Sequence, residues 1–184
     1  MKIFVTGHTS GIGKAVYNLA MKQGYTVAGG SRRTGFDISN TNVYSKVLDY
    51  DVLVNNAYHY TGQLELLKFV HSHWTNTPKK IINVGSWHKD TLLGRPLSRL
   101  NYNVAKKSLE TYSFWISDNE TLCKSMMYNP GYVDTPLARE GMNEWPISNQ
   151  QHILEQSMDA EECAKTILFM IESKYKIKEL THTY

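Results

Sequence analysis

Short apolar runs alternate with longer segments of helical periodicity along the chain. The runs are rich in β-branched and aromatic residues and end at glycine, proline or polar clusters, which is typical of buried strands. They predict strands over 2–6, 25–28, 51–55, 80–84 and 122–128, with an edge strand within 176–182. Apolar positions that recur every three to four residues predict helices over 12–23, 43–48, 64–73, 101–117 and 160–171.

Strands that alternate with helices predict the α/β class, with a doubly wound Rossmann-type parallel sheet and helices on both of its faces. At 184 residues the chain is expected to form a single domain over 1–184. The region 31–51 is short, with room for one small helix that Ser39 or Asn40 would cap.

Composition excludes several functional classes. The net charge of +3 is too small to indicate nucleic-acid binding, and no apolar run approaches the length of a membrane span. The cysteines, Cys123 and Cys163, lie far apart without metal-ligand spacing, so we expect buried thiols and no metal site. Without a secretory leader, the chain is expected to be cytoplasmic.

A glycine-rich turn, Thr6-Gly7-His8-Thr9-Ser10-Gly11-Ile12-Gly13, follows the first predicted strand and opens the first predicted helix. Glycines let a backbone approach a pyrophosphate closely, and a helix N-terminus favours negative charge. The turn therefore predicts a dinucleotide site, although a tight turn without a ligand has the same local pattern.

Tyr102 and Lys106 lie one helical turn apart, so both side chains project from one face of the predicted helix. An ammonium beside a phenol favours the phenolate, and moving a tyrosine pKa from about 10 to ~7 takes roughly 4 kcal/mol. Such a tyrosine can exchange a proton with a substrate oxygen near neutral pH. With a dinucleotide site nearby, the pair indicates hydride-transfer chemistry, unless it is only a surface pair on an amphipathic helix.

Five motifs in this order resemble those of the short-chain dehydrogenase/reductase family. They are Thr6–Gly13, Asn55-Asn56-Ala57, Ser86 after a strand, Tyr102-x-x-x-Lys106, and Pro130-Gly131 with Thr135. The resemblance implies that Tyr102 is the general acid or base, and that Lys106 lowers the pKa of Tyr102 and binds the nicotinamide ribose. It also implies that Ser86 holds the oxygen of a small carbonyl or alcohol substrate.

The same resemblance implies which residues hold the cofactor. Besides Tyr102 and Lys106, the contacts would come from Gly7, Thr9, Ser10, Gly11, Ile12, Gly13, Asn55, Asn56, Ala57, Pro130, Gly131, Val133 and Thr135.

The choice of cofactor depends on the end of the second strand, where the chain reads Gly29-Gly30-Ser31-Arg32-Arg33. An enzyme that uses NAD usually carries a carboxylate there, whereas an arginine fork suits a phosphate. We therefore expect NADP(H), with Ser31 and Arg32 or Arg33 at the 2′-phosphate, although a solvated basic turn is the alternative. By resemblance, Asp37 would accept a hydrogen bond from the adenine amino group.

The chain departs from the family pattern in three places. Tyr58 replaces a glycine after Ala57, and residues 61–73 lack the family's catalytic asparagine, so the water relay that it supports would be absent or rebuilt. The segment 31–51 is abbreviated, as in compact members. Residues 87–100 and 137–157 would form the substrate loop and lid, the latter with Met142, Trp145 and Ile147.

Some alternatives stay open. Ser98 is a rival to Ser86, but we expect it in a loop rather than directly after a strand. A dinucleotide-binding sensor without turnover is the second functional hypothesis, whereas an extended-branch epimerase is disfavoured because the chain lacks a substrate domain. By resemblance we expect a homodimer or homotetramer, and apolar candidates for its interface are Tyr112, Phe114, Trp115 and Ile116.

Overall fold

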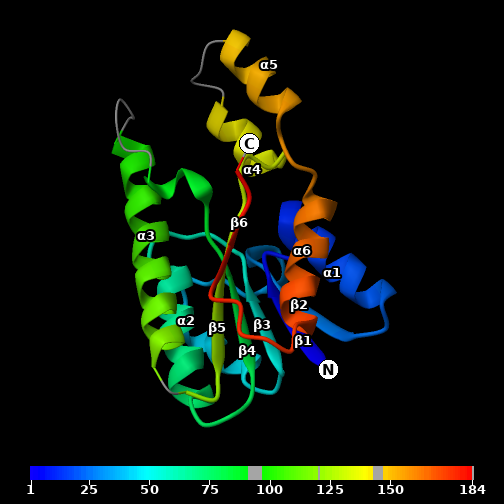
Figure 1. Ribbon diagram of the computed structural model, residues 1–184, viewed down its shortest axis with the longest axis vertical. Helices are drawn as coiled ribbons and strands as arrows, with labels where there is room; N and C mark the ends of the chain where they lie inside the picture. The colour runs from blue at the N-terminus through cyan, green and yellow to red at the C-terminus, as the bar shows by residue number, and fades with distance from the viewer. Residues whose placement is uncertain (91–96, 120, 143–146, 184) are drawn as a thin grey trace.

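The computed structural model describes residues 1–90, 97–119, 121–142 and 147–183. Within these ranges the chain forms one parallel sheet of six strands in the order β2-β1-β3-β4-β5-β6 (Figure 1). The strands are β1 (Lys2–Thr6), β2 (Thr26–Gly30), β3 (Val52–Asn55), β4 (Lys80–Val84), β5 (Lys124–Asn129) and β6 (Glu179–Thr181). The expected α/β class, parallel sheet and edge strand are confirmed.

Helices cover both faces of the sheet (Figure 1). Helices α1 (Gly11–Lys22) and α6 (Ala160–Glu172) pack on one face, and α2 (Gly62–Trp74) and α3 (Leu97–Asp118) pack on the other. Each face has its own apolar core, because the central strands are buried on both sides and point alternate side chains into each layer. This is a doubly wound architecture.

The strand order places a crevice beside β1. The chain passes from β1 to β2 on one side of β1, and then crosses to β3 on the other side. The connections therefore leave the carboxyl ends of β1 and β3 in opposite directions. In open α/β sheets, ligands bind at such a switch point, so the fold alone favours a site at this edge.

Strand β2 extends two residues beyond its predicted end and includes Gly29 and Gly30. Neighbouring rings cover both glycines: a Cβ at Gly29 would lie 2.1 Å from the His8 ring, and one at Gly30 would lie 2.5 Å from Phe36. Glycine in a strand is therefore required here by the close approach of other groups, which the sequence pattern does not reveal.

Other boundaries also differ from the expectations. Between β2 and β3 the chain forms two 3-10 helices, η1 (Arg32–Thr34) and η2 (Thr41–Val47), and Asn40 caps the second by accepting from the amide of Asn42. Helix α3 begins at Leu97 rather than at residue 101. The expectation that Ser98 lies in a loop was therefore wrong, because this residue belongs to the first turn of α3.

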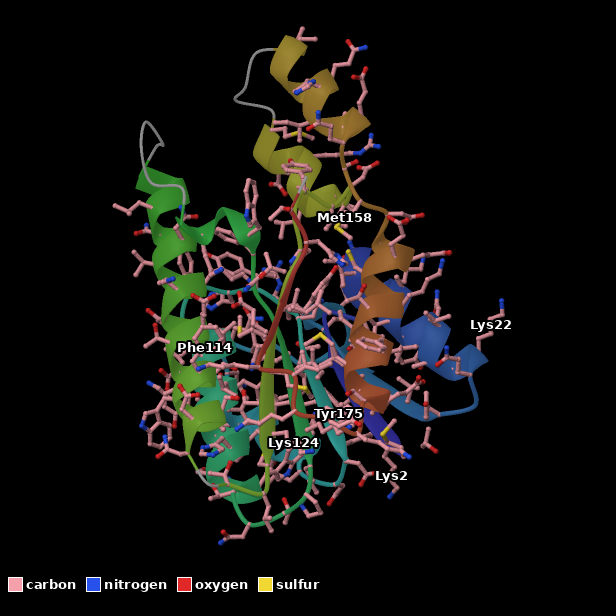
Figure 2. The ribbon with its side chains drawn as sticks, in the orientation of Figure 1. Lys2, Lys22, Phe114, Lys124, Met158 and Tyr175 are labelled. Carbon is pink, nitrogen blue, oxygen red and sulfur yellow. The ribbon has the colours of Figure 1, made fainter. Side chains whose placement is uncertain are left out.

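The segment expected to be a substrate lid is helical. Helices α4 (Pro136–Met142) and α5 (Ile147–Glu155) lie beyond the carboxyl ends of the strands (Figure 1). Met142 is buried and Ile147 is exposed, whereas Trp145 lies outside the described residues. Met158 marks the passage from α5 to α6 (Figure 2), where it pairs with Val133 in an isolated bridge.

Cys123 and Cys163 are buried and free, as expected, in the cores on opposite faces of the sheet. Of the apolar residues proposed for a subunit interface, Ile116 is fully buried in the core and Trp115 is half-exposed. Among the described residues, no helix combines the length and apolarity needed to cross a membrane.

Candidate functional site

Two adjoining pockets open at the switch point beside β1. The larger has a volume of about 450 Å³ and extends along the glycine turn, and the smaller has a volume of about 180 Å³ and reaches Ser86 and Tyr102. Both are lined by Ile12, Asn56, Tyr58, Thr135 and Leu137. A ligand that fills the larger pocket can therefore extend into the smaller one.

The glycine turn is built for close approach to a ligand. Gly7 and Gly11 have φ angles of +73° and +51°, in the left-handed region that side chains disfavour. A Cβ at Gly13 would lie 2.4 Å from the carbonyl oxygen of Gly7, so only glycine lets α1 start against the turn. Ser10 precedes α1 without a side-chain cap, which leaves the helix N-terminus suited to a phosphate.

The loop after β3 forms the opposite wall of the larger pocket. The Oγ1 atom of Thr6 accepts hydrogen bonds from the amides of Asn56 and Ala57, at 2.8 and 2.9 Å. The Nδ2 atom of Asn56 donates to the carbonyl oxygen of Thr6 at 2.9 Å. The threonine of the glycine motif thus braces this wall, a role that the motif alone did not indicate.

Two of the expected cofactor residues lie behind the pocket walls. Asn55 is fully buried, and its Nδ2 atom donates to the carbonyl oxygen of Gln63 at 2.9 Å and to Asn83 Oδ1 at 3.0 Å. Gly13 is buried against Gly7 and Asn56. Both residues therefore support the pocket walls through packing and hydrogen bonds and do not line the pocket themselves.

The far end of the larger pocket is lined by Ser31, Arg32, Arg33 and Asp37. Ser31 Oγ lies 3.2 Å from the hydroxyl oxygen of Thr34, within a reciprocal cap of η1. The Oδ1 atom of Asp37 accepts from the amide and the hydroxyl of the nearby serine, Ser39, both at 2.9 Å, and these bonds lower the pKa of Asp37.

The smaller pocket brings together Ser86, Tyr102 and Lys106, with Pro130 and Gly131 on its wall. These residues come from three elements: the turn after β4, helix α3 and the turn after β5. They meet because the parallel register of β4 and β5 ends both strands at the same edge of the sheet.

A buried polar network holds the turn that carries Ser86. The amide of Ser86 donates to Asn129 Oδ1 at 3.1 Å. Asn129 Nδ2 donates to Glu110 Oε1 at 3.3 Å and to Glu179 Oε1 at 2.5 Å, and Lys89 Nζ pairs with Glu110 Oε1 at 2.9 Å. Because Lys89 and Glu110 are each 5% exposed, breaking their pair would leave a buried charge.

Lys106 is buried beneath the pocket. Its Nζ atom donates to Gln63 Oε1 at 2.9 Å and to the carbonyl oxygen of Val84 at 2.8 Å. Burial lowers the pKa of Lys106 to about 7, because the charged form loses its hydration. Lys106 therefore titrates near neutral pH, so the ammonium expected beside Tyr102 is only partly populated at pH 7.

Gln63 was not predicted as a site residue. A helix predicted to start at residue 64 leaves Gln63 in the preceding loop, and the family pattern has an asparagine, not a glutamine, in this region. Gln63 lies in the first turn of α2, three and four residues before the buried Leu66 and Leu67. A polar residue in register with a buried helix face was the signal that could have found it.

Tyr58 stands between the two pockets. Its ring centroid lies 5.0 Å from that of Tyr102, and Lys106 Nζ lies 5.5 Å from the Tyr58 centroid. Burial raises the pKa of Tyr58. Two residues further on, Tyr60 has a φ of +30°, which is unusual for a residue with a side chain.

Further lining residues include Asn103 and Tyr132 in the smaller pocket, and Ile38, His59 and Pro136 in the larger. Leu137, Ala138 and Glu140, from the segment expected to form the lid, also line the site. The loop expected to select the substrate, 87–100, is described at its ends only, because 91–96 lie outside the described residues.

No family model and no curated protein matches the chain. Solved structures do. The chain is similar to a 3-ketoacyl-(acyl-carrier-protein) reductase from Brucella melitensis complexed with NADH, with a TM-score of 0.81, 16% identity, and coverage of 98% of this chain and 95% of that one. It is also similar to the NADH complex of a 3-alpha-hydroxysteroid dehydrogenase from Pseudomonas sp. B-0831, with a TM-score of 0.79, 18% identity, and coverage of 98% and 94%.

A third similar structure is a short chain dehydrogenase from Burkholderia cenocepacia J2315 in complex with NADP, with a TM-score of 0.77, 19% identity, and coverage of 100% of this chain and 88% of that one. The chain therefore has the fold of the short-chain dehydrogenases/reductases over its whole length, and the resemblance that its motifs indicated is confirmed at the level of the fold.

Proposed function

We propose that the chain is an oxidoreductase of the short-chain dehydrogenase/reductase family, which reduces a carbonyl or oxidises an alcohol with NADP(H). The observation that carries the proposal is the shared pocket of Ser86, Tyr102 and Lys106, which adjoins the pocket along the glycine turn. A binding protein needs the larger pocket alone, whereas a proton donor beside it suits catalysis.

The bound dinucleotide supplies the hydride that the carbonyl carbon accepts. On the protein side, Tyr102 gives its phenolic proton to the carbonyl oxygen as that oxygen gains negative charge, and takes it back in the alcohol direction. Ser86 holds the same oxygen, and the network through Asn129 keeps the turn of Ser86 in place. Lys106, when charged, favours the phenolate of Tyr102.

The preference for NADP(H) rests on the basic end of the larger pocket. Arg32 and Arg33 line it beside Ser31, and their guanidinium groups suit a 2′-phosphate. Asp37 lies past η1 rather than directly after β2, where a ribose-binding carboxylate would stand. Its Oδ1 atom accepts from Ser39, and its Oδ2 atom would accept from the adenine amino group.

A fluorescence titration of the purified protein with NADPH and NADH in parallel tests the cofactor assignment. We expect NADPH to bind at least tenfold more tightly than NADH, because charge-assisted hydrogen bonds to a phosphate are each worth about 1.5–3 kcal/mol. Equal affinities would contradict the assignment of the arginines, and binding of neither would contradict the function. A screen of carbonyl compounds with NADPH then tests for turnover. We further propose that the chain forms a homodimer or homotetramer, which sedimentation would measure, and that it acts in the cytoplasm.

A dinucleotide sensor without turnover is the second candidate, and Tyr58 favours it. The Tyr58 ring packs on Tyr102 in the pocket where a substrate carbonyl would lie. Under this hypothesis the dinucleotide binds with normal affinity, but no carbonyl compound in the screen accelerates NADPH oxidation.

A further inference from the structure

Gln63 uses both ends of its side-chain amide. Its Nε2 atom donates to the carbonyl oxygen of Asn55 at 2.5 Å, at the end of β3, and to that of Val84 at 3.0 Å, at the end of β4. Both N–H groups are thereby used on two strand ends. The reverse amide orientation would place Oε1 against two carbonyl oxygens, so the backbone fixes the direction in which Oε1 points.

Oε1 points at Lys106. It accepts from Nζ at 2.9 Å, and Nζ also donates to the carbonyl oxygen of Val84 at 2.8 Å. Gln63 and Lys106 therefore share Val84 as an acceptor and bond to each other. Gln63 is 2% exposed and Lys106 is 3% exposed, so water does not compete for these bonds.

Among the described residues, no carboxylate pairs with Lys106 Nζ, whose hydrogen-bond acceptors are Gln63 Oε1 and the carbonyl oxygen of Val84. The Tyr58 and Tyr102 rings lie with their centroids 5.5 and 5.6 Å away, from the loop after β3 and from α3. The carboxylate one turn further along α3, Glu110, pairs with Lys89 and Lys107 at 2.9 and 2.8 Å. Gln63 is therefore the side chain that solvates the buried amine.

We propose that Gln63 is a positioning residue that holds Lys106 beside Tyr102 and stabilises its ammonium form through one direct hydrogen bond. A buried ammonium needs acceptors in place of water. A carboxylate would supply one but would also cancel much of the positive charge, whereas a neutral amide leaves that charge available to the tyrosine. The effect on catalysis rests on the proposed function, but the effect on Lys106 does not.

This arrangement differs from a proton relay. An amide neither gives up nor takes a proton near neutral pH, so Gln63 holds the lysine without passing a proton onward. The site thus has a fixed support for Lys106 in the helix where the family pattern has an asparagine.

The test is an NMR titration of the protein labelled with ¹³C at the lysine ε carbons, without dinucleotide. Loss of one signal in Lys106→Met assigns the resonance. We expect the midpoint of Lys106 to fall by about one pH unit in Gln63→Met, which has a similar length but no acceptor, and to rise by about one unit in Gln63→Glu, which places a carboxylate beside the amine. Glu65→Gln, which changes a half-exposed side chain on the same helical turn, is the matched control and should leave the midpoint unchanged.

Opposite shifts in the two Gln63 variants support the proposal, because a merely structural defect would not reverse its sign. Midpoints that coincide with the wild type in both variants overturn it. If Gln63→Met does not fold, the Gln63→Glu variant decides alone: a raised midpoint supports the proposal, and an unchanged midpoint overturns it. In the turnover assay, we expect the alkaline limb of kcat to follow the same shifts, with little change in KM. If no carbonyl is turned over but the midpoints shift, the proposed function fails and the assignment of Gln63 stands.

Discussion

The ring of Tyr58 packs against the ring of Tyr102, with the centroids 5.0 Å apart, at the boundary between the two pockets. In the family pattern a glycine follows Ala57, and a glycine at this position could not make the contact. It places an aromatic wall directly beside the proposed proton donor, and it gives the smaller pocket an aromatic side.

Removing the wall should widen the pocket. We expect Tyr58→Gly to lower the KM for bulky carbonyl substrates, while costing about 2 kcal/mol of stability because a half-buried ring and a restricted backbone position are both lost. Tyr58→Phe keeps the ring and is the control. Steady-state kinetics on a small and a bulky carbonyl substrate check this. If the ratio of their kcat/KM values is the same in Tyr58→Gly as in wild type, Tyr58 does not limit the size of the substrate.

The two arginines at the far end of the larger pocket should act on one cofactor alone. We expect Arg32→Ala and Arg33→Ala together to weaken NADPH binding by about tenfold or more, with NADH binding nearly unchanged, because only NADPH carries the 2′-phosphate. Lys2→Ala with Lys22→Ala, which also removes two positive charges, is the control, since both side chains are exposed and project away from the fold (Figure 2). Equal losses for both cofactors would show a general electrostatic effect.

The packing of His8 on Gly29 can be tested by a pair of substitutions. A Cβ at Gly29 would lie 2.1 Å from the His8 ring, so Gly29→Ala should displace the glycine turn, weaken dinucleotide binding and cost about 1–3 kcal/mol of stability. The double variant Gly29→Ala with His8→Ala should recover much of the stability. Chemical unfolding measures both, and additive losses would contradict the contact.

The titration of Lys106 should appear in the stability of the protein. Burial lowers its pKa from 10.5 to about 7, so between these values the unfolded chain binds more protons than the folded one, and the free energy of unfolding rises with pH. Below about 7 both states are protonated and the full cost of burying the ammonium is present. We expect the stability of wild type relative to Lys106→Met to increase from pH 7 to 9, as measured by urea unfolding, whereas a constant difference would contradict this pKa.

The sequence predicted the elements that depend on local patterns. Strands β1, β3 and β4 were placed correctly because their apolar runs end at glycines or polar residues. The glycine turn and the Tyr102–Lys106 spacing likewise depend on neighbouring residues, and the structure brings both to one edge of the sheet.

Features that depend on tertiary contacts could not be predicted from local sequence patterns. Gly29 and Gly30 belong to β2 because they pair with Val5 and Thr6 of β1. The Asn55 side chain lies outside the pocket because it hydrogen-bonds Asn83 in the next strand. Gln63 was hidden for the same reason, since its role depends on three partners that are 8, 21 and 43 residues away in the chain.

The most direct measurement compares wild type with Tyr102→Phe for both NADPH binding and NADPH oxidation with a carbonyl substrate. The substitution removes one hydroxyl and keeps the ring that packs on Tyr58. We expect NADPH to bind the variant with nearly unchanged affinity, and the oxidation rate to fall by about 10²–10⁴-fold, because the general acid is lost. Equal oxidation rates in the two proteins would contradict the assignment of Tyr102 as the proton donor.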